Sequence, residues 1–255
     1  MPARLDGTVF LSGMRILYVG PLAATTRHSH HAAQIVVAPQ GLDIEDGANR
    51  RIRARAAVVV IPPRRHHRHG ACTHAAVLFL DGDDPTSREL SRNADRQCPA
   101  WERDLVDVSI PRDPTAEQAS ALLATILARV QGAVAVRESP GLQHPAVRRM
   151  RAYLDRSDHV DLGSLAQQAG LSPRQMRHAF ALEVGLSMRA YLRWKRLLRA
   201  AAAVEAGASL SAAAAAAGFA DSAHLSRVFR DQFGITPTQG LRSIRWRTLD
   251  RGAAL

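Results

Sequence analysis

The first eighty residues alternate short apolar runs with turn residues. The runs are rich in Val and Ile, and Gly, Pro, Asp and Asn separate them. Many short strands at close spacing, with turn residues between them, are typical of a small sandwich or barrel. We therefore predict strands at 9–11, 15–19, 32–37, 42–44, 55–61 and 75–80.

A helical period begins at Thr115. Pro114 precedes this segment, Glu117 lies in its first turn and Gly132 closes it, which predicts a helix over 115–132. Its apolar stripe packs either on the strands of the same chain or against the same stripe of a second copy, in a homodimer. The residues that would make the dimer contact are Leu122, Leu123, Ile126, Leu127 and Val130.

The region 162–242 contains one pattern twice. Each copy has an Ala four residues before a Gly, and a Phe five residues before a second Gly. This repeat predicts two helix-turn-helix units, at about 161–184 and 209–233, joined by a long helix. We also predict a helix over 145–156 before the units and a final helix from Thr236 to about residue 247.

The two patterns divide the chain. The turn cluster at 139–141 and the change of composition around it predict a linker at 133–143. The predicted organisation is a β-barrel-like domain with one helix over 1–132, then the linker, then an all-α domain over 144–250. The expected fold class is therefore α+β.

Charge is concentrated in the repeated half. The chain has a formal net charge of +11, and residues 141–255 carry +9 of it. A basic half that also contains the helical repeat favours a polyanionic partner. Nearly all its cations are Arg, which suits forked contacts to phosphate and guanine, although a GC-rich genome gives the same bias.

Cysteine content and hydropathy indicate the compartment. Cys72 and Cys98 are too few for a disulfide framework. No signal peptide and no apolar run of membrane-spanning length is present. We therefore expect a cytoplasmic protein without a membrane partner.

The second helix of each unit, the recognition helix, is predicted to expose polar and cationic side chains. Apolar residues that include Phe180 and Phe229 share its inward face. Long polar side chains on the outward face can reach base edges and phosphates in the major groove. The candidate DNA-binding residues are Arg174, Gln175, Arg177, His178, Ser222, Ser226, Arg227 and Arg230.

The spacing of the two units also fits double-stranded DNA. A joining helix of about 20 residues spans roughly 30 Å, close to one turn of B-DNA. One monomer could therefore place both recognition helices in successive major grooves. The alternatives are a helical interaction domain with a solvated basic face and a chromosome-architectural protein that binds DNA with little specificity.

Two sequences in the second unit are more specific than the repeat itself. They are GFADSAHLSRVFR over 218–230 and FGITP over 233–237, with Arg242 after them. Together they resemble the signature of the AraC/XylS family of transcription regulators. The resemblance implies base contacts from Arg174, Arg177, His178, Ser222, Ser226 and Arg227. It also implies a regulator that has no enzymatic activity. We expect this regulator to be an activator, to form a dimer, and to have promoter DNA and RNA polymerase as partners.

This sequence departs from the family pattern in the second unit. Ala213 replaces a larger aliphatic residue within an alanine tract over 212–217, and Gly240 replaces a common aromatic. We therefore expect the second unit to be less well packed than the first. Arg177→Ala should consequently cost more DNA binding than Arg227→Ala.

Regulators of this family usually carry a cupin-like effector domain, which the predicted strands fit. His28, His30 and Gln34 follow the spacing of a first cupin motif with Gln in place of Glu, and His67 falls at the fourth position of that site. Three imidazoles and an amide could hold Ni, Zn or Fe. An organic effector in the barrel and no ligand at all are the alternatives. The missing carboxylate argues against a cupin enzyme fused to the DNA-binding half.

Overall fold

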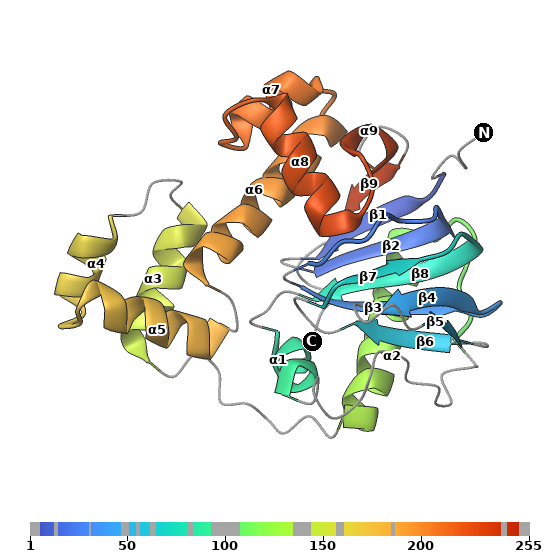
Figure 1. Cartoon of the computed structure of the whole chain (residues 1–255), viewed down its shortest axis with the longest axis horizontal. Helices are drawn as coiled ribbons and strands as arrows, with labels where there is room; N and C mark the ends of the chain where they lie inside the picture. The colour runs from blue at the N-terminus through green and yellow to red at the C-terminus, as the bar shows by residue number, and fades with distance from the viewer. Residues whose placement is uncertain are drawn as a thin grey trace.

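The chain folds into a β-rich half followed by a helical half, so the expected α+β class is confirmed (Figure 1). The structure is a computed structural model. It describes residues 6–12, 15–30, 32–46, 51–54, 57–61, 65–80, 84–92, 108–134, 144–156, 161–184, 187–240 and 244–249. Most of the predicted linker, at 135–143, and Cys98 lie outside these residues.

The strands form two sheets. A six-stranded sheet has the order β6-β3-β8-β2-β1-β9, and a three-stranded sheet has the order β5-β4-β7. The strands of the first half are β1 (Thr8–Ser12), β2 (Arg15–Leu22), β3 (Ala33–Ala38), β4 (Leu42–Asp46), β5 (Arg51–Ala54), β6 (Ala57–Ile61), β7 (His67–His69) and β8 (Cys72–Leu80).

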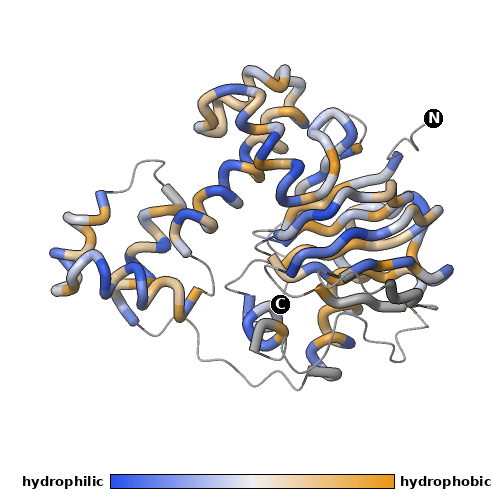
Figure 2. The backbone as a smooth tube through the Cα atoms, viewed as in Figure 1, coloured by the Kyte–Doolittle hydropathy of each residue, from blue (hydrophilic) through white to orange (hydrophobic). Residues whose placement is uncertain are grey.

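The larger sheet is buried on both faces. Successive side chains of a strand point to opposite faces, and along β2 they alternate between two hydrophobic clusters. Leu17 and Val19 belong to one cluster, while Ile16 and Tyr18 belong to the other. This explains why the strands contain near-continuous apolar runs. Hydrophobic and hydrophilic positions along them are seen in Figure 2.

Helix α2 (Ala116–Val134) covers one face of this sheet. It begins with a reciprocal cap, in which Thr115 Oγ1 accepts from Gln118 N at 3.2 Å and Gln118 Oε1 accepts from Thr115 N at 3.0 Å. Its apolar stripe packs on side chains such as Phe10 and Leu78 of the sheet. The short helix α1 (Pro85–Arg92) precedes it.

The second half is helical. Its elements are α3 (Pro145–Arg156), α4 (Leu162–Gln168), α5 (Pro173–Val184), α6 (Met188–Glu205), α7 (Leu210–Ala216), α8 (Ser222–Phe233) and α9 (Pro237–Gly240). In Figure 1, α3 to α5 lie at one end of the molecule, away from the sheet, and α6 leads from them to α7 and α8, of which α8 lies beside β1 and β2. None of the helices described could cross a membrane.

The predicted final helix over 236–247 is wrong beyond its first turn. Thr236 and Gln239 cap each other and start α9, which ends at Gly240. The chain then forms β9 (Arg245–Thr248), which pairs in parallel with β1, Thr8 opposite Arg245. The free edge of β1 offers backbone hydrogen bonds that a longer helix could not satisfy. The C-terminal segment is therefore part of the N-terminal sheet.

Candidate functional site

The first helix-turn-helix unit consists of α4 and α5, with Gly170 in the turn at φ +65°. Asp161 caps α4 by accepting from Ser164 N at 3.2 Å. On α5, Met176 and Phe180 are buried with no more than 1% of their surface exposed. The exposed face carries Arg174, Gln175, Arg177 and His178.

One of these predicted contacts already has a structural role. Gln175 Oε1 accepts from Ser172 N at 2.8 Å, and Ser172 Oγ accepts from Gln175 N at 3.2 Å. This reciprocal cap fixes the start of α5. Arg174, Arg177 and His178 are thus better placed than Gln175 to extend toward DNA.

The second unit consists of α7 and α8, with Gly218 in the turn at φ +77°. Asp221 Oδ1 accepts from His224 N at 2.6 Å and caps α8. Arg227 and Arg230 are exposed on α8, whereas Ser222 and Ser226 are half-buried. Ser226 Oγ donates to the carbonyl of Ser222 at 2.8 Å, so this hydroxyl can only accept from a further partner.

The alanine tract of α7 is not loosely packed, contrary to the expectation from sequence. Ala213, Ala214 and Ala217 have no exposed surface. Ala214 and Ala217 belong to the same cluster as Trp194 and Leu197 of α6. Small side chains allow α6 and α7 to approach closely. This close approach compensates for the small apolar surface of the alanines.

The unusual Gly240 has a similar explanation. A Cβ atom at this position would lie 2.7 Å from Cζ of Phe229. The ring of Phe229, on α8, therefore occupies the space where a side chain at position 240 would begin. The family position Arg242 lies outside the described residues.

Helix α6 sets the distance between the units. Its 18 residues correspond to about 27 Å at 1.5 Å per residue. Ser187 caps it by accepting from Ala190 N at 3.3 Å. This length is close to one helical turn of DNA, which suits two recognition helices entering successive major grooves.

The predicted metal or effector residues come together where the two halves of the chain meet. The ligand atoms of His28, His30 and His67 lie within 4.8 Å of one another. Gln34 Oε1 is 2.8 Å from Nε2 of His30 and 3.0 Å from Nε2 of His67. We call these four residues the histidine cluster. Neighbouring His31 lies outside the described residues, as do residues 62–64 before His67.

All three imidazoles of the cluster are buried and hold their Nδ1 atoms in the same way. Each Nδ1 donates to a backbone carbonyl: that of Thr26 at 2.8 Å, Ala32 at 2.6 Å and Arg65 at 2.9 Å. Burial lowers the pKa of His28 to about 4, and it lowers the pKa values of His30 and His67 as well. Burial therefore favours the neutral form of all three rings.

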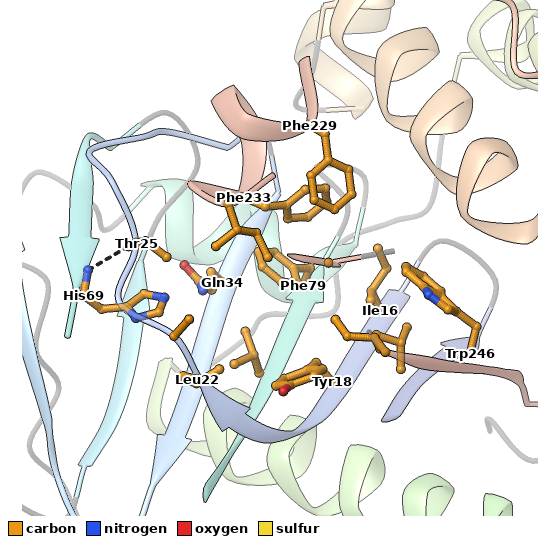
Figure 3. A pocket seen from close by; sticks show the side chains of 16 residues that line it. Ile16, Tyr18, Leu22, Thr25, Gln34, His69, Phe79, Phe229, Phe233 and Trp246 are labelled. Atoms are coloured by element: carbon orange, nitrogen blue, oxygen red, sulfur yellow. Dashed lines mark hydrogen bonds between the residues drawn. The ribbon is translucent and has the colours of Figure 1, made fainter. Parts of the chain in front are cut away.

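An apolar cavity of about 90 Å³ lies next to this cluster, between the sheet and the second unit (Figure 3). Ile16, Tyr18 and Phe79 line it from the sheet, and Phe229 and Phe233 line it from α8. Its polar groups include Thr25, Gln34, His69 and Trp246. Within the described part of the chain, the buried indole Nε1 of Trp246 has no hydrogen-bond partner.

The sequence did not identify this cavity, because its wall comes from distant segments. The sequence pattern predicts a helix at Trp246, whereas the alternation of Arg245, Trp246, Arg247 and Thr248 fits a strand. His69, although buried, stands outside the group of three histidines that could hold a metal. His74 is elsewhere, with Nε2 3.1 Å from the carbonyl oxygen of Ile110.

The residues proposed for dimerisation lie in the core of the chain itself. Their exposed fractions do not exceed 7%, and all of them pack in the cluster beneath the six-stranded sheet. The helix stripe therefore packs on the strands of its own chain, which is the first of the two alternatives given by the sequence. These residues are Leu122, Leu123, Ile126, Leu127 and Val130.

Comparisons with known proteins agree with this architecture. A family model described as a helix-turn-helix domain matches residues 165–243. No curated protein sequence matches the chain. Among solved structures, an apo point variant of ToxT from Vibrio cholerae superimposes with a TM-score of 0.56 at 12% identity, covering 91% of this chain and 98% of that one. Wild-type ToxT from V. cholerae, bound to an unsaturated fatty acid, has a TM-score of 0.54 at 12% identity, with 94% and 97% covered.

The family match and the structural likeness agree on the arrangement of the helical half. The matched segment contains both recognition helices and the helix that joins them. The likeness to ToxT extends over nearly the whole of both chains and includes the β-rich half. Residues 165–243 therefore match a helix-turn-helix domain, and the chain has the fold of ToxT over nearly its whole length.

Proposed function

We propose that the chain is an effector-responsive, sequence-specific transcription activator that acts on promoter DNA together with RNA polymerase. The observation that carries this proposal is the shared cavity. The same helix, α8, presents Arg227 outward and forms one wall of the cavity with Phe229 and Phe233. A ligand between the sheet and α8 would bear directly on a recognition helix.

The size of the cavity supports a coupling between ligand and helix position. Ligand pockets commonly enclose roughly 300–1,000 Å³, whereas this cavity holds about 90 Å³. An effector of ordinary size would need the second unit to shift away from the sheet. Binding energy would then favour one arrangement of the two recognition helices over another.

The lining indicates an apolar effector with a small polar group. Among the described residues that line the cavity, those other than the polar groups named above are hydrophobic or Gly, and none is Lys or Arg. A ToxT structure was solved with an unsaturated fatty acid. The described lining of this cavity offers polar groups that include the imidazole of His69, the amide of Gln34 and the N–H of Trp246. We therefore expect a neutral molecule to bind better than a carboxylate.

A matched pair of ligands tests the effector proposal. Calorimetric titration of the full chain with a cis-unsaturated fatty alcohol and with the corresponding fatty acid should show tighter binding of the alcohol. Ile16→Phe, which fills the cavity from β2, should weaken both. Tighter binding of the acid, or equal binding by the Ile16 variant, would contradict the proposed site.

Sequence-specific DNA binding requires its own test. Affinity for the DNA upstream of the chain's own gene should exceed affinity for random DNA of equal length at one fixed salt concentration, because base contacts add to phosphate contacts. Equal affinities would favour an architectural protein over a specific regulator.

The histidine cluster supports a second candidate, a metal-responsive regulator. One ligand atom from each of the three histidines lies within 4.8 Å of the others, and the amide oxygen of Gln34 contacts two of the rings in this buried site. In metal-binding proteins, imidazole ligands commonly donate their other nitrogen to a carbonyl or carboxylate, as these three do through Nδ1. We propose that Zn, Ni or Fe(II) is the bound ion, a set that N-donor ligands favour.

A further inference from the structure

We infer that metal binding by the histidine cluster fixes the second recognition helix, α8, against the β-rich half; this rests on the metal site proposed above. The reason is that two of the metal-binding side chains belong to a segment, residues 25–30, that also contacts the end of α8. The site and the DNA-reading element are therefore in direct contact.

The segment is attached to α8 by backbone hydrogen bonds. Thr26 N donates to the carbonyl of Gly234 at 3.1 Å, and Ser29 N donates to the carbonyl of Asp231 at 3.3 Å. Thr26 Oγ1 donates to the same Gly234 carbonyl at 3.1 Å. The last carbonyls of a helix have no partner within the helix, so these bonds serve as its C-terminal cap.

The same segment is attached to the strand that carries the third histidine. His28 and His67 exchange two backbone hydrogen bonds of 3.0 Å each, and Thr25 N donates to the carbonyl of His69 at 3.0 Å. A metal shared by His28, His30 and His67 would add a stronger link between the segment and β7. Residues 25–30 would then be held by β7 on one side and by α8 on the other.

The closest approach is between His28 and Gly234. Gly234 ends α8 in the left-handed conformation, with φ +69°. A Cβ atom there would lie 2.5 Å from Nδ1 of His28, so the imidazole occupies the space that any other residue would need. A change in the position or mobility of His28 therefore reaches the helix end without any intermediate residue.

The functional consequence concerns the two recognition helices. Helix α8 carries Arg227 and Arg230, whereas α5 packs in a separate core. A metal that immobilises α8 on the sheet would set the position from which the second unit meets DNA. By thermodynamic reciprocity, a change at the end of α8 must also alter the affinity for the metal.

The experiment uses the full chain, purified without a histidine tag. Calorimetric titration with Zn should give one bound ion per chain, and His67→Ala should abolish this binding. Absence of Zn binding by the parent would remove the metal-responsive candidate itself, and the present inference with it.

A pair of glycine variants then tests the coupling separately. Gly234→Ala should weaken Zn binding on the order of tenfold, because the new methyl group displaces His28. Gly170→Ala is the matched control: it is also left-handed, at φ +65°, but a Cβ there meets nothing within 4 Å. It should bind Zn as the parent does. If the parent binds Zn and both variants bind it equally tightly, the coupling is overturned while the metal site stands.

Hydrogen exchange on the parent protein, with and without Zn, gives a second measurement. This measurement requires no variant. Zn should slow amide exchange at 230–236 as well as at 25–30, and should leave α5 unchanged. Slower exchange at 25–30 without any change at 230–236 would overturn the inference.

Discussion

The two helix-turn-helix units share a sequence pattern but differ in what they are packed against. The first unit closes its own core, in which Met176, Phe180 and Tyr191 pack with residues of α3. The second unit has no separate core, because Leu225 and Phe229 of α8 belong to one cluster with Val9 and Phe79 of the sheet. Figure 1 shows the same difference, with one unit extended away from the sheet and the other beside it.

Two copies of one motif can therefore differ in whether they move independently of the rest of the molecule. Regions with separate cores open and move independently, whereas regions that share a core do so together. The first unit can seat itself on DNA without disturbing the β-rich half. We expect the second unit to follow changes at the cavity or the histidine cluster, and we propose that it links ligand binding to DNA binding.

The largest test of the comparison removes one aromatic ring from each core. Phe180→Ala and Phe229→Ala should each cost about 3–5 kcal/mol, because both rings are buried. The Phe180 variant should lose hydrogen-exchange protection only in α3, α4, α5 and the start of α6. The Phe229 variant should lose it in α8 and also in β1, β2 and β8.

Each phenylalanine variant serves as the control for the other. Both remove the same ring, so a difference in where protection is lost reflects connectivity and not chemistry. The distinction between the two units would be wrong if Phe180→Ala reduced protection in the sheet. It would also be wrong if Phe229→Ala reduced protection in α8 alone.

A smaller effect is expected from the exposed arginines. A bidentate contact from Arg to a base contributes about 1–3 kcal/mol. Arg177→Ala should cost about 2 kcal/mol of specific DNA binding and Arg227→Ala about 1 kcal/mol, because only the first unit is free to optimise its fit. Fluorescence anisotropy at one fixed salt concentration measures both.

Arg112→Ala supplies the matched charge control, since Arg112 is exposed in the β-rich half. It should leave specific binding unchanged. A larger loss from Arg227→Ala than from Arg177→Ala would reverse the proposed order of the two units.

The smallest effects concern the caps. Ser172→Ala and Asp221→Ala each remove the side chain that accepts from the first turn of a recognition helix, at a cost of about 1 kcal/mol. Ser172→Ala should raise hydrogen exchange in α5 alone. Asp221→Ala should raise it in α8 and in residues 25–30, which are hydrogen-bonded to the end of that helix. Equal, purely local effects would argue that the segment does not follow α8.

Much of this fold was predictable because its signals are local. Alternating apolar residues gave the strands, and the spacing of Ala, Gly and Phe gave both helix-turn-helix units. The histidine cluster was also predictable, since His28, His30 and Gln34 lie on one short segment and the motif spacing added His67.

The remaining features depend on contacts between distant segments. Nothing near Arg245 in the sequence indicates that β1 has a free edge, so the local pattern predicts a helix where the chain forms its final strand. The cavity was missed for the same reason, as Phe79 and Phe233 meet only after the two halves pack. The alanine tract misled because its composition does not reveal how closely α6 approaches.

The parallel pairing of β9 with β1 also bears on how the protein can be divided. A cut at the segment between α2 and α3 would yield an N-terminal fragment in which β1 keeps β2 but has lost β9, so that one edge of β1 is exposed. An exposed strand edge is a template for pairing with another molecule. Such a fragment should self-associate edge to edge, and its oligomeric state would then describe a broken sheet and not the assembly of the intact chain.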